Sequence, residues 1–212
     1  MRLTGRGRLA GLIAIVLSLA AFAAGPCANA LADDAVPGAD ENAGDQPGVV
    51  PSPDQEQLDP QFQRQLVFYR TSAAPGTIVI QTSERFLYLV QGNNRAMRYG
   101  IGVGRDGFQW QGQLKIARKQ EWPDWRPPPE MIERQPYLPR FMAGGPGNPL
   151  GARAMYLGGT VYRIHGTNLP ETIGTAVSSG CFRLVNPDVI DLFDRVPVGT
   201  KVIVRQAPSV EG

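Results

Sequence analysis

Short apolar segments separated by turn residues, between residues 77 and 103, constrain the fold more than any other feature of the chain. Thr77–Ile80 and Arg85–Val90 are rich in β-branched and apolar residues, which is typical of β-strands. Residues 91–94, Gln-Gly-Asn-Asn, can adopt the positive φ values that tight hairpin turns require. Arg95–Val103 then alternates apolar and small side chains. The pattern predicts a β-hairpin or meander.

Glycine and proline interrupt the remaining sequence so often that a helical bundle is disfavoured. The 212 residues include 25 glycines and 19 prolines, which favours strands and loops. Gly100, Gly102 and Gly104 leave one face of their strand without side chains and therefore predict the close approach of another backbone or a ligand. Phe108–Ala117 predicts a further pair of strands. The length fits one domain with appendages.

The C-terminal half combines an irregular segment with regular elements. Glu121–Asn148 contains seven prolines and several aromatic residues, so it is either a functional lid or a loop that packs its aromatics over the sheet. Ala154–Leu157 and Val161–His165 are predicted strands. Asn186 is a good N-cap for an amphipathic helix that runs towards Pro197.

The first 32 residues are typical of an export signal. Three arginines precede an apolar run, and two small-x-small cleavage sites end at Ala30 and Ala32. We predict a signal peptide over residues 1–32, a periplasmic or envelope location and no stable membrane span after processing; a retained anchor is the alternative. Cleavage would remove Cys27 and leave Cys181 as the single cysteine.

A charged linker follows the predicted signal. Residues 33–59 carry eight acidic and no basic residues, a composition that disfavours a packed core. We therefore predict a largely disordered, Pro/Gly-rich linker over residues 33–75, in which the amphipathic run Phe62–Tyr69 leads into the body. The body is predicted at residues 76–206, with a C-terminal tail at residues 207–212.

The charge of the body indicates an acidic partner. Residues 60–212 carry 18 Lys or Arg against 11 Asp or Glu, a surplus of 18 − 11 = 7, which favours a partner with phosphates or carboxylates. Solubility alone is the alternative explanation. The arginines are not interleaved with aromatics and match no nucleic-acid motif, so we predict no nucleic-acid partner.

The body contains one histidine and one cysteine, the two residue types most suited to nucleophilic catalysis. His165 is the only histidine, and Cys181 follows it by sixteen positions. A thiol becomes a good nucleophile when a base or cation lowers its pKa, and Arg183 adds positive charge nearby. The alternative is a buried, unreactive thiol beside a core histidine. One histidine is too few for a zinc site, and we expect no metal or cofactor.

These residues match a known family. The matching motifs are His165-Gly166-Thr167-Asn168, Ile173-Gly174 and Ser178-x-Gly180-Cys181-Phe182-Arg183-Leu184-x-Asn186. The stretch resembles the L,D-transpeptidase catalytic domain, the YkuD-type fold, of bacterial cell-wall enzymes, and the resemblance covers about 130 residues. It implies a mainly β, YkuD-like sandwich with a short helix after the cysteine and a long Pro/Trp-rich loop.

The resemblance also implies roles for individual residues. Cys181 would be the nucleophile, His165 the general base and acid, and the Gly166 carbonyl the group that orients the imidazole. Gly180, with Cys181, would supply oxyanion N–H groups. The residues implied in substrate binding are Arg183, Asn186, Ser178, Ser179 and Asn168. Ser179 departs from the family pattern, which has a second histidine at that position. Independently of the resemblance, Glu171 is the acidic residue of the stretch that could orient His165 instead.

The implied reaction is acyl transfer on peptidoglycan. The cysteine would take the acyl group of a stem tetrapeptide, release D-alanine and pass the acyl group to an amine. A second stem as acceptor gives a 3→3 cross-link, and an envelope protein as acceptor becomes attached to the wall. Water as acceptor would make the protein an L,D-carboxypeptidase. A Cys-His cell-wall hydrolase and a non-catalytic peptidoglycan-binding module remain as alternatives.

Overall fold

The computed structural model describes residues 47–51 and 58–206. The predicted signal peptide at 1–32, the linker residues 33–46 and 52–57, and the tail at 207–212 lie outside the described residues. All described residues belong to one compact unit, Val36–Gly212. Across the two described ranges, no helix has both the length and the apolar character that crossing a membrane requires.

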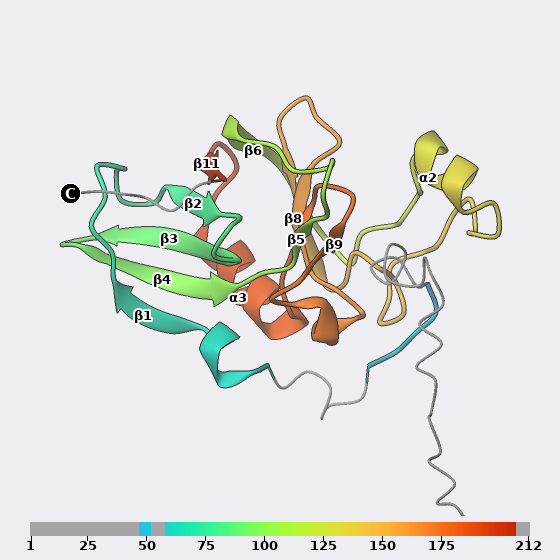
Figure 1. The fold of residues 1–212 in the computed structure, drawn as a ribbon, viewed down its shortest axis with the longest axis horizontal. Helices are drawn as coiled ribbons and strands as arrows, with labels where there is room; N and C mark the ends of the chain where they lie inside the picture. Colours follow the sequence, from blue (N-terminus) through green and yellow to red (C-terminus); the bar gives the residue numbers. More distant parts are fainter. Residues whose placement is uncertain (1–46, 52–57, 207–212) are drawn as a thin grey trace, which may run out of the picture. The chain divides into compact units, whose positions relative to one another are not determined.

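The elements are predominantly short strands (Figure 1). The strands are β1 (Gln65–Phe68), β2 (Ile78–Gln81), β3 (Phe86–Gly92), β4 (Arg95–Gly100), β5 (Val103–Gly104), β6 (Gly112–Glu121), β7 (Arg153–Leu157), β8 (Arg163–His165), β9 (Ala176–Ser178), β10 (Phe182–Arg183) and β11 (Lys201–Arg205). The helical segments are η2 (Pro60–Phe62), α2 (Pro129–Arg134), η3 (Pro170–Thr172) and α3 (Asn186–Arg195).

The strands form one bent sheet and a small second sheet. The order in the large sheet is β1-β4-β3-β2-β11-β6-β7-β8-β10, and β5 pairs with β9. The long strand β6 joins the two halves, because its start pairs with β11 and its end with β7. A register shift between Ile116 and Arg118 marks the junction. Such an irregularity bends a strand, which lets both halves of the sheet face a common core.

The main core confirms the mainly β, sandwich-like prediction. One cluster of buried apolar side chains draws on both halves of the sheet and on α3. Its members include Ile78, Ile80, Leu87, Leu89, Tyr99, Ile116, Met155, Leu157, Ile164, Phe182, Val189, Leu192, Val202 and Val204. The predicted helix after the cysteine is confirmed as α3, which Figure 1 shows beside the strands. Val189 and Leu192 of α3 are fully buried in this cluster.

The predicted hairpin is confirmed. β3 pairs antiparallel with β4, and the turn residues Asn93 and Asn94 have φ values of 52° and 53°. Two successive positive φ values fit the type I′ turn, whose twist matches the strands that it joins. The predicted close approach at the glycines is also confirmed. A Cβ at Gly104 would lie 2.8 Å from the Phe108 carbonyl oxygen and 3.1 Å from Gly180 Cα.

Two local predictions are wrong. Phe108–Ala117 does not form a strand pair; residues 112–121 form the single strand β6, because β11 and β7 supply its hydrogen-bonding partners in turn. Asn186 is not the N-cap of α3, which begins at Asn186 after Val185 and has no side-chain cap. The Asn186 Oδ1 instead accepts a hydrogen bond from the Ala152 N–H at 2.9 Å.

The ordered body begins before residue 76, in part of what the sequence assigned to the linker. β1 pairs antiparallel with β4. The Phe62 ring occupies space that a side chain at Gly174 would need. Arg64 Nη1 lies 3.0 Å from Asp191 Oδ2 of α3. Pairing, packing and an ion pair therefore fix a segment whose composition alone suggested disorder.

The Pro/Trp-rich segment is a packed loop with a small core of its own. Trp125, Met131, Leu138 and Leu150 form a separate buried cluster, and α2 lies within the segment. The buried Asn148 amide donates to three loop carbonyls, at distances of 3.0 to 3.3 Å. These bonds replace the sheet ladder that the prolines prevent.

Candidate active site

Two parallel strands place the predicted catalytic pair on one face of the sheet. β8 pairs with β10, with Arg183 opposite His165. Ile164 and Phe182, which are 0% and 1% exposed, point to the opposite face and enter the main core. Because strand side chains alternate, His165 and Arg183 share the face away from that core. Cys181 immediately precedes β10.

These residues line a small cavity of about 50 Å³. The sheet side is lined by Val161, Arg163, His165, Ser178, Ser179, Cys181 and Arg183, and the loop side by Trp125, Pro128, Met131, Pro149 and Leu150. The Pro/Trp-rich loop therefore forms one wall of the cavity and buries Trp125, whereas Trp122, Tyr137 and Phe141 are exposed. Packing of the aromatics is thus confirmed only for Trp125, and the lid interpretation stays a prediction.

His165 is buried and held in one tautomer. Its side chain is 3% exposed, and Nδ1 lies 2.5 Å from the Gly166 carbonyl oxygen. A carbonyl oxygen only accepts hydrogen bonds, so Nδ1 carries the hydrogen and Nε2 is left as an acceptor. Burial, reinforced by the Arg183 cation, lowers the pKa of His165 from 6.5 to about 3, although the Gly166 bond opposes this change. The imidazole is therefore neutral near neutral pH.

The neutral imidazole predicts a loss of stability in acid. Below pH 6.5 the unfolded chain binds a proton at His165 that the folded chain excludes until about pH 3. The contribution of His165 to the free energy of unfolding should thus be fully present above pH 6.5. Below pH 6.5 it should fall by up to about 1.4 kcal/mol per pH unit. Urea denaturation of the wild type and His165→Gln, over a range of pH, measures this difference. A difference between the two proteins that does not change with pH would contradict the prediction.

A serine hydroxyl closes the turn that carries Cys181. Ser178 Oγ donates to the Cys181 carbonyl oxygen at 2.6 Å and accepts from the Gly180 N–H at 3.2 Å. Gly180 has a φ of +99°, a conformation that disfavours other residues. The Gly180 N–H, predicted as an oxyanion donor, thus bonds to Ser178 in this structure. Ser179 lines the cavity, and its buried Oγ has no hydrogen-bond partner within residues 47–51 and 58–206.

An aromatic residue that the sequence did not single out supports the same turn. Trp110 Nε1 donates to the Gly180 carbonyl oxygen at 3.0 Å. The indole stacks on Tyr162, with ring centroids 4.6 Å apart and an interplanar angle of 14°. A Cβ at Gly180 would lie 2.7 Å from Tyr162 Cε1. The peptide before the cysteine is therefore held on both sides, and we expect Trp110 to position Cys181.

Trp110→Phe should weaken this support without removing the ring stack. Loss of a partly buried hydrogen bond costs about 1 kcal/mol, and we expect about a tenfold slower alkylation of Cys181, since small displacements of a reacting group are costly. The alkylation rate and the melting temperature are the two measurements. A variant that loses stability but alkylates at the wild-type rate would show that Trp110 only supports the fold.

Two predicted substrate contacts lie outside the cavity lining. Asn186 Oδ1 binds the Ala152 N–H, and the same oxygen fills space that a side chain at Gly166 would need. Asn168 Nδ2 donates to the Val49 carbonyl oxygen at 3.0 Å. The structure therefore gathers Cys181, His165, Arg183, Ser178 and Ser179 around the cavity and places both asparagines in backbone contacts.

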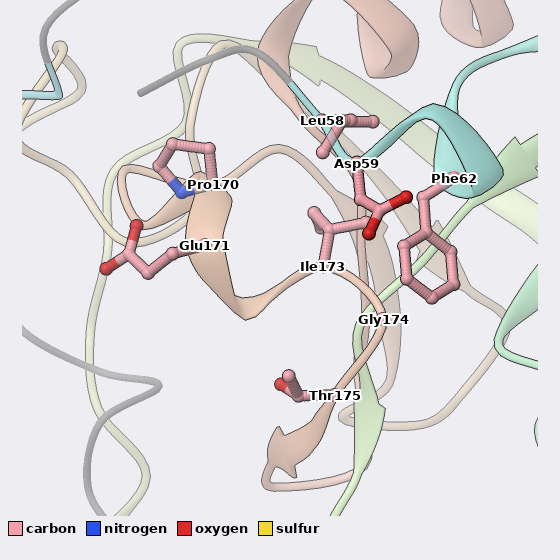
Figure 2. Close-up of a pocket in the computed structure, with 8 residues that line it drawn as sticks. All are labelled: Leu58, Asp59, Phe62, Pro170, Glu171, Ile173, Gly174 and Thr175. Carbon is pink, nitrogen blue, oxygen red and sulfur yellow. The ribbon is translucent and has the colours of Figure 1, made fainter. Parts of the chain in front are cut away.

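Glu171, the alternative orienter of His165, belongs to another pocket (Figure 2). This hollow, of about 600 Å³, is lined by Leu58, Asp59, Phe62, Pro170, Glu171, Ile173, Gly174 and Thr175. Neither His165 nor Cys181 is among its lining residues. The Gly166 carbonyl, and not Glu171, is the group in contact with the imidazole.

Comparison with known proteins points to the same family. The family model for the L,D-transpeptidase catalytic domain, YkuD, matches residues 75–204. The probable L,D-transpeptidase ErfK/SrfK of Escherichia coli (strain K12) is 41% identical over 138 residues, which is 62% of this chain and 44% of that protein. The probable L,D-transpeptidase YbiS of the same strain is 41% identical over 135 residues, or 59% and 43% of the two chains. The match spans less than half the length of these two curated relatives.

A solved structure is also similar. The crystal structure of a probable carnitine operon oxidoreductase caia from Brucella melitensis is 52% identical, with a TM-score of 0.47 over 72% of this chain and 99% of that one. The matched family model covers both His165 and Cys181. This chain belongs to the L,D-transpeptidase catalytic domain (YkuD) family.

Proposed function

We propose that the protein is an exported L,D-transpeptidase that acylates Cys181 with a peptidoglycan stem tetrapeptide. The observation that carries the proposal is that Cys181 and His165 line the same cavity. The imidazole there is neutral, and its Nδ1 is hydrogen-bonded to the Gly166 carbonyl oxygen. Membership of the family supports the same reaction class. Residues 1–32, with the features of a signal peptide, support export.

In the first half of the reaction, His165 acts as base and then as acid. Nε2 accepts the proton of the Cys181 thiol, and Sγ attacks the carbonyl carbon of the third residue of the stem. The bond to the terminal D-alanine breaks, and the leaving amine takes the proton back from Nε2. The products are a thioester on Cys181 and D-alanine, with His165 neutral again.

In the second half, an amine attacks the thioester carbonyl. Its proton passes to Nε2, the carbon–sulfur bond breaks, and the proton returns to the thiolate of Cys181. The amine of a second stem gives a 3→3 cross-link, the amine of an envelope protein gives attachment to the wall, and water gives a tripeptide. The protein supplies the same groups for each acceptor.

The developing negative charge on the carbonyl oxygen needs hydrogen-bond donors. The Gly180 N–H already donates to Ser178, so its use would require that bond to be exchanged. We assign the first donor role to the Cys181 N–H, and assign Ser178 to holding the turn in which that N–H lies. Arg183, opposite His165 in the strand pair, adds positive charge to the site.

Product analysis tests the proposal. The purified protein, incubated with disaccharide-tetrapeptide, should release D-alanine and form an acyl adduct on Cys181 that mass spectrometry detects. A dimer with a 3→3 link identifies a stem as acceptor, and a tripeptide identifies water. Retention of the protein on sacculi with no product and no adduct would favour the non-catalytic binding module and overturn the proposal.

A further inference from the structure

Arg163 is the charged residue of the cavity lining to which the catalytic assignments give no role. It lies two positions before His165 in β8, so both side chains project from the same face of the strand. It lines the cavity together with His165 and Cys181. Its cation contributes to the lowered pKa of His165, which shows that the two groups lie within electrostatic range.

The cavity is positively charged. Arg163 and Arg183 both line it, and none of its lining residues in the described part of the chain is acidic. The Arg163 Nε is buried and has no hydrogen-bond partner among the described residues. An uncompensated buried charge is costly, and an anion bound in the cavity would offset the charge of the guanidinium.

The neighbours of Arg163 hold its side chain without neutralising it. Tyr156 lies opposite Arg163 in the β7–β8 pair, and the guanidinium carbon lies 5.4 Å from the centre of the tyrosine ring. Arg118 lies opposite Tyr156 on the other side, with its guanidinium carbon 3.7 Å from the same ring. The two arginines therefore share one aromatic partner, but only Arg163 lines the cavity.

We propose that Arg163 binds a carboxylate of the acyl-donor peptide and thereby sets the donor specificity of the site. This inference rests on the proposed transpeptidase function. A guanidinium fork matches the two oxygens of a carboxylate and forms charge-assisted bonds. Arg163 is better suited than Arg183, which is only 2% exposed and lies deeper in the protein. The carboxylate is either that of the C-terminal D-residue or one on a side chain of the stem.

Three donors and three variants test the role of Arg163. The donors are the tetrapeptide, its C-terminal carboxamide and its side-chain carboxamide, and the variants are Arg163→Met, Arg163→Lys and the control Arg118→Met. One carboxamide should lower the wild-type kcat/KM by about 10- to 100-fold, the usual range for a charge-assisted bond. With the unmodified donor, Arg163→Met should lower kcat/KM by the same factor, mainly by raising KM. With that carboxamide as donor, the kcat/KM of Arg163→Met should not fall any further.

Two control variants separate recognition of the carboxylate by Arg163 from a general effect of positive charge and from an effect on folding. Arg163→Lys keeps the charge but not the fork, and should recover only part of the lost kcat/KM. Arg118→Met removes the same charge from the same tyrosine ring and should behave as the wild type. The inference is overturned if Arg163→Met still discriminates the carboxamides as the wild type does, or if Arg118→Met loses as much as Arg163→Met.

A binding measurement keeps the inference separate from the proposed function. Calorimetry compares Cys181→Ala with Cys181→Ala/Arg163→Met, using the unmodified tetrapeptide as ligand. Binding that is about 10- to 100-fold weaker in the double variant supports the inference, even if the wild type forms no product and the transpeptidase proposal fails. Equal binding by both proteins, or binding by neither, overturns it.

Discussion

Cys181→Ala should form no acyl adduct and release D-alanine at least about 1,000-fold more slowly than the wild type. The thiolate is the proposed nucleophile, and loss of a nucleophile in related acyl-transfer sites costs several orders of magnitude in rate. The fold should survive, because the hydrogen-bonded turn around residue 181 uses its backbone carbonyl and not its side chain. Intact-mass analysis and D-alanine release give the two measurements.

The matched control for this experiment is the stability of the same variant. Its melting temperature should stay close to that of the wild type, since the Cys181 side chain is only partly buried and its contact with the Val161 carbonyl oxygen is long at 3.9 Å. Cys181→Ser offers a second test. It should react much more slowly than the wild type, because a hydroxyl is much less readily deprotonated than a thiol. Product formation by Cys181→Ala at more than a tenth of the wild-type rate would refute the assignment.

His165→Ala should lower kcat/KM by about 100- to 10,000-fold, the range for loss of a general acid–base group. It should also slow the reaction of Cys181 with iodoacetamide near neutral pH, because no other histidine exists in the chain to accept the thiol proton. The acid side of the rate profile should lack an inflection at pH 6.5, since the pKa of His165 lies near 3.

The labelling experiment needs a control for the loss of a buried side chain. Removing the imidazole, which is 3% exposed, leaves a cavity that destabilises the protein. His165→Gln fills more of that space but cannot act as a base near neutral pH, and it should label as slowly as His165→Ala. Equal labelling rates in the wild type and both variants would exclude activation of the thiol by His165.

Local sequence signals predicted the elements that depend on local chemistry. The hairpin follows from two asparagines that tolerate positive φ, and α3 follows from the amphipathic pattern that buries Val189 and Leu192. The motifs around His165 and Cys181 predicted a shared site, and the parallel strand pair brings the two residues together, because His165 ends β8 and Cys181 immediately precedes β10. These features need only short stretches of sequence to specify them.

Other features depend on partners distant in the chain. Trp110 supports Gly180 seventy positions later, and no periodicity in the sequence indicates that contact. Asn186 fits an N-cap by local rules, but the Ala152 N–H is a competing donor that only the tertiary fold supplies. The contact of Arg163 with Tyr156 depends on the register of β7 and β8, which the local sequence around Arg163 does not specify.

The pairing of β1 with β4 has a practical consequence for anyone who shortens this chain. A version begun at residue 76, where the strand-rich pattern starts, would lack β1 and leave the backbone donors and acceptors of β4 open along one edge. Unprotected edges recruit strands from other molecules, so the shortened protein should self-associate. β1 itself ends the sheet with Leu66 and Phe68 exposed at 49% and 71%. We therefore expect the solubility of a shortened domain to depend on this edge of the sheet, well away from the cysteine.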